Sequence, residues 1–91
     1  MEIYSSKFKK TVYNENESLI CNYWTEADMA DEDFVHEIAV WAEQVEKYKP
    51  TKLLADTRKF NFTVSVQLQE WTDKEVFPRL MNSGVKNSQF L

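Results

Sequence analysis

Hydrophobic and polar residues alternate in two neighbouring segments near the N-terminus. Phe8 to Tyr13 alternates apolar residues with lysines and threonine, and Ser18 to Trp24 is rich in aliphatic and aromatic side chains. Such alternation is typical of β-strands that bury one face, and the polar residues 14–17 between the two segments suit a turn. The two segments are therefore predicted to pair as an antiparallel hairpin.

A helical pattern follows from about Asp31 to Lys49. Acidic residues fill its first turn and lysines its last, which suits the helix dipole at both ends, and Pro50 is expected to stop the helix. One apolar stripe recurs at spacings of three and four residues and consists of Phe34, Ile38, Trp41, Val45 and Tyr48. His36 falls on the opposite side of this helix and is expected to face solvent, whereas Trp41 is expected in the core.

The segment Lys52–Asp56 reads KLLAD, a short apolar run that ends in an acid. Such a run is typical of a strand buried on both faces of a parallel sheet. The stretch from Trp24 to Lys52 is long enough to hold the preceding helix, so the two strands and the helix are predicted to form a right-handed β-α-β unit.

A second helix is predicted to start near Ser65, a plausible N-cap residue. Its apolar face, which includes Trp71 as a core residue, shifts by about half a turn near Pro78, so we expect a break there and a second short helical piece that ends at residues 82–84. The tail Val85–Leu91 is predicted to be the next parallel strand. It lacks a continuous apolar run, so we expect either that the strand lies at the edge of the sheet or that the chain is cut short of the elements that would cover it.

These elements define an α/β fold: an N-terminal antiparallel hairpin followed by β-α-β-α-β, with helices packed on a small mixed sheet. The 91 residues leave room for one domain, residues 1–91. One cysteine, one histidine and one glycine exclude an internal disulfide, a structural zinc site and a Gly-rich phosphate loop, so no metal and no cofactor is expected. No apolar run approaches the length of a membrane span, which favours a cytoplasmic protein.

The charge is distributed unevenly along the chain. Residues 14–46 hold ten Asp or Glu and no Lys or Arg, while the formal net charge of the whole chain is −4. An acidic surface repels nucleic acid and anionic lipid headgroups, and it favours a basic protein partner or simply a solvated face.

The order of elements and several short segments resemble the SpoIIAA-like (STAS-like) superfamily, in a bacterial branch. The segments are Trp24, Leu53–Arg58, Gln69–Trp71, Pro78 and Gly84–Val85. The resemblance implies an α/β domain that acts by binding other proteins. It also implies that the superfamily pattern continues beyond Leu91 by another helix and strand, which leaves a sheet edge exposed for a homodimer.

The best-known members of this superfamily are switched by phosphorylation of a Ser or Thr at a helix start. The resemblance makes Ser65 or Thr63 the possible phosphoacceptor in this chain. The alternative for Ser65 is an ordinary N-cap.

Candidate ligand-binding residues gather where the parallel strands end. The carboxyl ends of such strands meet at one rim of the sheet, and these residues are Tyr23, Trp24, Asp56, Thr57 and Arg58. Asp56 and Arg58 could pair with each other or bind a polar ligand beside Trp24. The alternative is that Asp56 caps a loop and Arg58 is solvated.

Acid-base catalysis has little support in the sequence. Asp56 beside the acidic loop 26–28 is the only paired-carboxylate candidate for a hydrolase-type activity, and neither Cys21 nor His36 has an evident catalytic partner. The sequence therefore predicts a non-enzymatic protein-interaction or regulatory module. The alternative is a small-molecule or lipid-binding domain that uses the rim at the carboxyl ends of the parallel strands.

Overall fold

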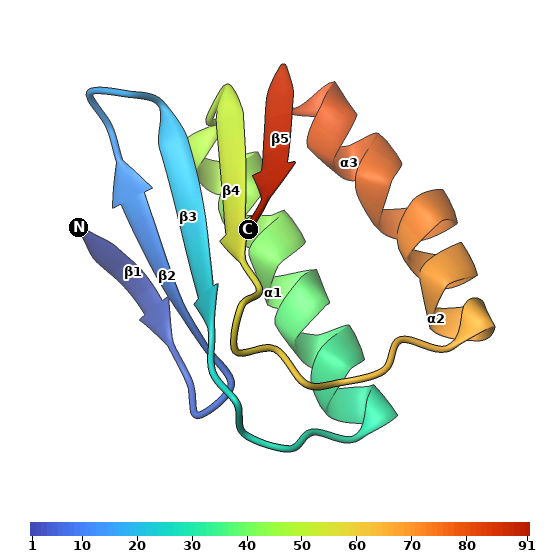
Figure 1. The fold of residues 1–91 in the computed structure, drawn as a ribbon. Coiled ribbons are helices and arrows are strands. Elements are labelled where there is room, and N and C mark those ends of the chain that lie inside the picture. The colour runs from blue at the N-terminus through green and yellow to red at the C-terminus, as the bar shows by residue number, and fades with distance from the viewer.

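Five strands form one mixed sheet whose spatial order follows the chain, in a computed structural model that describes residues 1–91 (Figure 1). The strands are β1 (Glu2–Ser5), β2 (Lys9–Asn14), β3 (Leu19–Trp24), β4 (Lys52–Asp56) and β5 (Asn87–Phe90). The strands β1, β2 and β3 pair antiparallel, whereas β4 runs parallel to β3 and β5 runs parallel to β4. The α/β class, the hairpin and the parallel placement of KLLAD are thus confirmed.

The strand β1 adds a fifth member that the sequence did not predict. It pairs with β2 through an irregular register between Glu2 and Tyr4. Its four residues alternate too briefly to stand out as a strand, because a short segment can satisfy several periodicities at once. With β1 in place, the edges of the sheet are β1 and β5.

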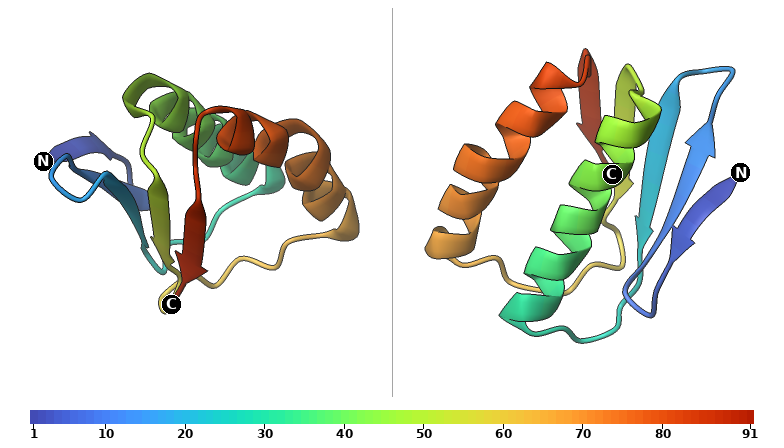
Figure 2. Two further views of the ribbon diagram at one scale, coloured as in Figure 1. Left: turned by 90° about the horizontal axis from the view of Figure 1, so that it is seen from above. Right: turned by 180° about the vertical axis from the view of Figure 1, so that it is seen from behind.

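Both helical layers cover the same face of the sheet, as the view from above shows (Figure 2). The helix α1 (Asp31–Tyr48) connects β3 to β4, and the helical segments between residues 66 and 82 connect β4 to β5. Both connections step across the sheet in the same direction, and connections of one hand that do so place their helices on one side. None of the helices combines the length and apolar character needed to cross a lipid bilayer.

The expectation that β4 is buried on both faces is wrong. Leu53 and Ala55 are buried beneath the helices, whereas Leu54 points to the uncovered face and is only half-buried. An apolar run of this length cannot distinguish a strand covered on both faces from one covered on a single face.

The N-terminus of α1 is closed by a reciprocal cap. The backbone N–H of Ala30 donates to the carboxylate of Asp33 at 2.9 Å, and the N–H of Asp33 donates back to the Ala30 carbonyl at 3.1 Å. At the other end Lys49 adopts a left-handed conformation with φ 52°, and the buried Pro50 ends the helix as expected. His36 is exposed, as predicted.

The second helical region contains a π-helical segment before Pro78. The segments are α2 (Val66–Trp71), η1 (Thr72–Val76) and α3 (Phe77–Asn82), with Pro78 in the first turn of α3. The predicted break thus takes the form of a π-helical stretch that ends just before α3. The wider turn rotates the apolar face, so that Val76 and Leu80 both reach the core.

The hydrophobic core lies between the sheet and this helical layer. Eleven buried residues form it: Ile20, Trp24, Phe34, Ile38, Trp41, Ala42, Val45, Leu53, Val76, Leu80 and Val85. All members of the predicted α1 stripe take part, with Tyr48 half-buried at the margin. The core thus packs both helical segments against the same face of the sheet.

Candidate functional site

Two hollows lie near the carboxyl ends of the parallel strands. The first, which we name the rim groove, has a volume of about 650 Å³ and is mainly polar. Its lining residues are Ser5, Ser6, Lys10, Tyr23, Trp24, Thr25, Glu26, Asp56, Arg58 and Lys59. It therefore brings together four of the five residues predicted to bind a ligand, Thr57 being the exception.

Asp56 and Arg58 pair with each other across the loop that follows β4. Arg58 Nε and Nη2 donate to the two oxygens of Asp56 at 2.9 and 2.6 Å, and the Arg58 backbone N–H also donates to Oδ1 at 3.2 Å. The hydrogen bonds from Arg58 hold the pKa of Asp56 below its ordinary value. Because Arg58 lowers the pKa of Asp56 and donates hydrogen bonds to both of its carboxylate oxygens, Asp56 is a poor general base.

Thr57 faces away from the rim groove. Its hydroxyl and its backbone N–H both donate to the carbonyl of Leu91, the latter at 3.0 Å, and its side chain lines the second hollow. Neighbouring residues of a strand point to opposite faces, so Thr57 could not join Asp56 in the groove.

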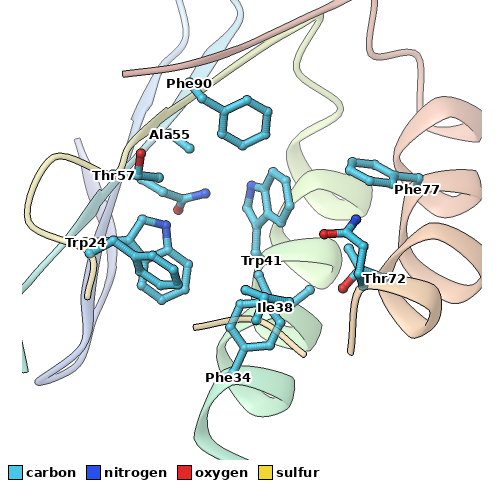
Figure 3. A pocket seen from close by; sticks show the side chains of 13 residues that line it. Trp24, Phe34, Ile38, Trp41, Ala55, Thr57, Thr72, Phe77 and Phe90 are labelled. Carbon is cyan, nitrogen blue, oxygen red and sulfur yellow. The ribbon is translucent and has the colours of Figure 1, made fainter. Parts of the chain in front are cut away.

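The second hollow, which we name the aromatic cavity, lies between the sheet and the helices and has a volume of about 200 Å³ (Figure 3). Nine of its thirteen lining residues are hydrophobic. The lining comprises Asn22, Trp24, Phe34, Ile38, Trp41, Ala55, Thr57, Phe60, Val64, Gln69, Thr72, Phe77 and Phe90. Trp24 belongs to both hollows and separates them.

Aromatic rings pack closely at one end of the aromatic cavity. The ring of Phe60 meets the edge of Trp24 at a centroid distance of 5.0 Å, and Phe34 stacks on Phe62 at 5.2 Å. Such contacts stabilise the loop after β4 beyond the gain from burial alone. The loop thus lines one end of the cavity with apolar surface.

Few polar groups face the aromatic cavity, and most of them are already hydrogen-bonded. Asn22 Oδ1 accepts from the hydroxyl of Thr11 at 2.7 Å, the Thr72 hydroxyl donates to the Leu68 carbonyl at 2.8 Å, and the Gln69 amide donates outward to Asp73 at 3.0 Å. The indole Nε1 of Trp41 is fully buried and has no hydrogen-bond partner. No charged residue lines the cavity.

Sequence reasoning missed the aromatic cavity, although it left one usable signal. Asn22 alternates with Ile20 and Trp24 on β3 and is buried on the helix-covered face. A polar side chain at a core position of a strand is unusual and often marks a special environment. The other lining residues read as ordinary core, because hydrophobic periodicity cannot distinguish a filled core from a hollow one.

The two possible phosphoacceptors occupy different environments. Ser65 is half-buried at the N-cap of α2, where its Oγ accepts from the N–H of Leu68 at 3.2 Å. Thr63 is exposed in the preceding loop. The cap interpretation of Ser65 thus has a direct structural basis, and phosphorylation of either residue stays a prediction.

Comparison with known proteins adds no functional information for this chain. No protein-family model, no curated protein and no solved structure matches this chain.

Proposed function

We propose that this domain is a non-enzymatic small-molecule-binding module that holds its ligand in the aromatic cavity. The observation that carries the proposal is a mainly apolar hollow of about 200 Å³, partly open to the surface, between the sheet and the helices of a domain of 91 residues. Protein interiors are normally packed to crystal density, with few voids larger than a water molecule. An unfilled hollow of this size therefore costs stability, and a ligand that fills it recovers the lost contacts.

The size and lining of the cavity indicate the scale of the ligand. An apolar cavity of about 150 Å³ stays dry and takes up benzene. The aromatic cavity is slightly larger and mainly apolar, so it suits a molecule with one aromatic ring and a short substituent. The rim groove is a weaker site for a ligand, because Asp56 and Arg58 neutralise each other and Arg58 is 72 % exposed.

A toluene titration tests the proposal, and we expect saturable binding. Tryptophan fluorescence and the amide resonances of residues around the cavity measure this binding. The variant Ala55→Leu places a larger side chain in the cavity and is expected to weaken toluene binding at least tenfold. Ala39→Leu is the matched control, because Ala39 lies half-buried on α1 outside the lining. If Ala55→Leu does not fold, Thr72→Leu serves as a second variant that places a larger side chain in the cavity, from the helical side.

Two results would count against this assignment. The first is toluene binding that never saturates in the folded protein. The second is equal affinity in Ala55→Leu and Ala39→Leu, since a ligand held elsewhere does not respond to the volume of the aromatic cavity.

A second candidate function is the protein-interaction module, with homodimerisation through β5. The observation that favours it is the difference between the two sheet edges. The register of β1 is irregular, which blunts an edge, whereas β5 reads NSQF and holds neither proline nor charge. A solution mass of twice 10.8 kDa supports this candidate, and a strict monomer at high concentration removes it.

The resemblance to SpoIIAA-like proteins supports this second candidate, and membership in that superfamily stays a prediction. So does a basic protein partner at the acidic outer face of α1. The exposed acids Asp31, Glu32 and Glu43 lie on this helix, while Glu37 is buried and faces the sheet.

A further inference from the structure

We infer that the ligand of the aromatic cavity is a neutral, ring-sized molecule with a hydrogen-bond acceptor, and that Trp41 Nε1 donates to this acceptor. The inference rests on the proposed function and names the chemical class of the ligand. It starts from a fully buried polar atom of a lining residue that has no hydrogen-bond partner within the protein.

Trp41 is held firmly in this position. It belongs to the apolar stripe of α1, its residue is 7 % exposed, and it packs in the hydrophobic core. Figure 3 shows its ring among the lining side chains, with the indole nitrogen on the side of Trp24 and Thr57. Buried indole N–H groups usually find a partner, because leaving a buried donor unpaired costs free energy.

The protein supplies no acceptor for this donor. No oxygen of the lining lies within hydrogen-bond distance of Trp41 Nε1. The hydroxyls of Thr57 and Thr72 donate to the carbonyls of Leu91 and Leu68, and Asn22 Oδ1 accepts from Thr11. A buried water would need two to four polar partners, and the polar groups of the lining are mostly engaged with other residues of the chain. The acceptor is therefore expected to come from a bound molecule.

The charge of the surroundings argues for a neutral ligand. An ion buried without a counter-charge loses its hydration and gains little in return. Two cations near Trp24 are engaged elsewhere: Arg58 pairs with Asp56, and Lys9 Nζ donates to the backbone carbonyl of Glu37 at 3.1 Å. A carboxylate in the aromatic cavity would meet a hydrogen-bond donor but no positive charge.

The shape of the lining argues for a ring. Aromatic side chains reach the cavity from the sheet, from α1 and from α3, namely Trp24, Phe34, Trp41, Phe77 and Phe90, and the loop after β4 adds Phe60. Offset stacking and edge-to-face contacts with these rings favour an aromatic guest over a flexible chain of equal volume. The predicted class is a small aromatic ketone, aldehyde or amide.

Three probes with the same number of heavy atoms separate the contribution of the hydrogen bond from the effect of charge. Acetophenone carries a carbonyl oxygen, α-methylstyrene replaces that oxygen by a methylene group, and benzoate adds a negative charge. We expect acetophenone to bind at least about fivefold more tightly than α-methylstyrene, since one hydrogen bond in a dry site adds about that factor. Benzoate is expected to bind more weakly than both.

The indole N–H of Trp41 provides a direct readout. Acetophenone is expected to shift the proton and nitrogen resonances of the Trp41 indole N–H downfield. α-Methylstyrene has no acceptor and is expected to cause no such downfield shift. Trp41→Phe keeps an aromatic ring and removes the donor, so acetophenone should lose its advantage over α-methylstyrene. Trp71→Phe is the matched control, because Trp71 is half-buried outside the cavity lining and its replacement should leave the ratio unchanged.

The outcomes separate the two proposals. If none of the three probes binds, the proposed function fails together with the inference. If acetophenone and α-methylstyrene bind equally and the Trp41 N–H resonance does not move, the cavity binds ligands but the inference is wrong. Preferred binding of benzoate overturns the neutral class. The resonance measurement uses the unaltered chain, so the test holds even if Trp41→Phe does not fold.

Discussion

Lys9 is buried at 0 % exposure on the helix-covered face of β2. Its Nζ donates to the Glu37 backbone carbonyl at 3.1 Å and lies 5.4 Å from the ring centres of both Tyr4 and Trp24. The carboxylate of Glu37 accepts from the hydroxyls of Tyr4 at 2.7 Å and Ser6 at 2.9 Å. This polar cluster ties β1 and the following turn to the middle of α1.

Burial lowers the pKa of Lys9 to about 8, against an opposing attraction from Glu37. The unfolded chain therefore binds this proton more tightly than the folded chain. The destabilisation is complete below pH 8 and fades as the pH rises from about 8 towards the ordinary lysine value of 10.5. We expect the free energy of unfolding to rise by roughly 1–2 kcal/mol between pH 8 and 9.5.

Urea unfolding across this pH range measures the effect, with Lys9→Met as the variant that removes it. Lys10→Met is the matched control, because Lys10 is exposed on the same strand. The rise should be present in the original chain and in Lys10→Met, and absent from Lys9→Met. A rise of equal size in all three proteins would assign it to another group.

The exposed ion pair of the rim groove is expected to matter little for stability. Arg58 is 72 % exposed, and the attraction within an exposed pair is largely offset by solvent screening and by the entropy lost in ordering the side chains. Asp56→Asn should therefore leave the free energy of unfolding nearly unchanged and the toluene affinity unaltered. Thermal unfolding and a toluene titration check both parts, and a large loss of affinity would move the ligand from the aromatic cavity to the rim groove.

At the scale of elements, the cap of α2 offers a matched pair of hydroxyl residues. Ser65→Ala removes the acceptor for the Leu68 N–H and is expected to cost about 1 kcal/mol of unfolding free energy. Thr63→Ala changes an exposed residue two positions earlier and is expected to cost almost nothing. Chemical denaturation compares the two variants, and equal losses would show that Ser65 does not stabilise the helix start.

The elements with a clear period were predictable from the sequence. The stripe through Phe34 and Val45 defines α1, and the KLLAD run gives β4 its observed limits. The π-helical segment was visible only as a phase shift near Pro78, because a wider turn and a break rotate the apolar face alike. The burial of Lys9 was also not predicted. Alternation along β2 places Lys9 on the inward face, but lysine residues are almost always exposed.

The aromatic cavity was the least predictable feature. Tyr23, Trp24, Asp56 and Arg58 were placed correctly at one rim, because strand ends of a parallel sheet converge by topology alone. A cavity depends instead on how completely the side chains of the sheet, of α1 and of the second helical region fill the space between them. Trp41 and Phe77 have the periodicity of core residues whether or not a void lies between them.

At the scale of the whole molecule, the placement of both helical layers on one face leaves the other face of the sheet uncovered (Figure 2). Val12 and Leu54 are half-buried on that face, and Tyr23 is 38 % exposed. The sheet also ends at β5, whose four residues are all exposed. Self-association through the edge of β5 would extend the sheet without disturbing the core.

The backbone of β5 decides how edge pairing can be tested. The N–H groups of Asn87 and Leu91 donate to β4 or its flanking residues at 3.1 and 2.8 Å. Since successive residues of a strand point their N–H groups to opposite sides, the N–H of Ser88 faces the free edge. Ser88→Pro therefore removes a donor from the free edge and keeps the bonds between β4 and β5.

We expect the original chain to sediment as a dimer at concentrations of tens of micromolar, and Ser88→Pro to sediment at 10.8 kDa. Ser88→Ala is the matched control, because it changes the side chain and retains the N–H. Both variants should keep the far-ultraviolet spectrum of the original. A dimer that survives in Ser88→Pro would place the interface on the uncovered sheet face, where the edge donors of β5 play no part.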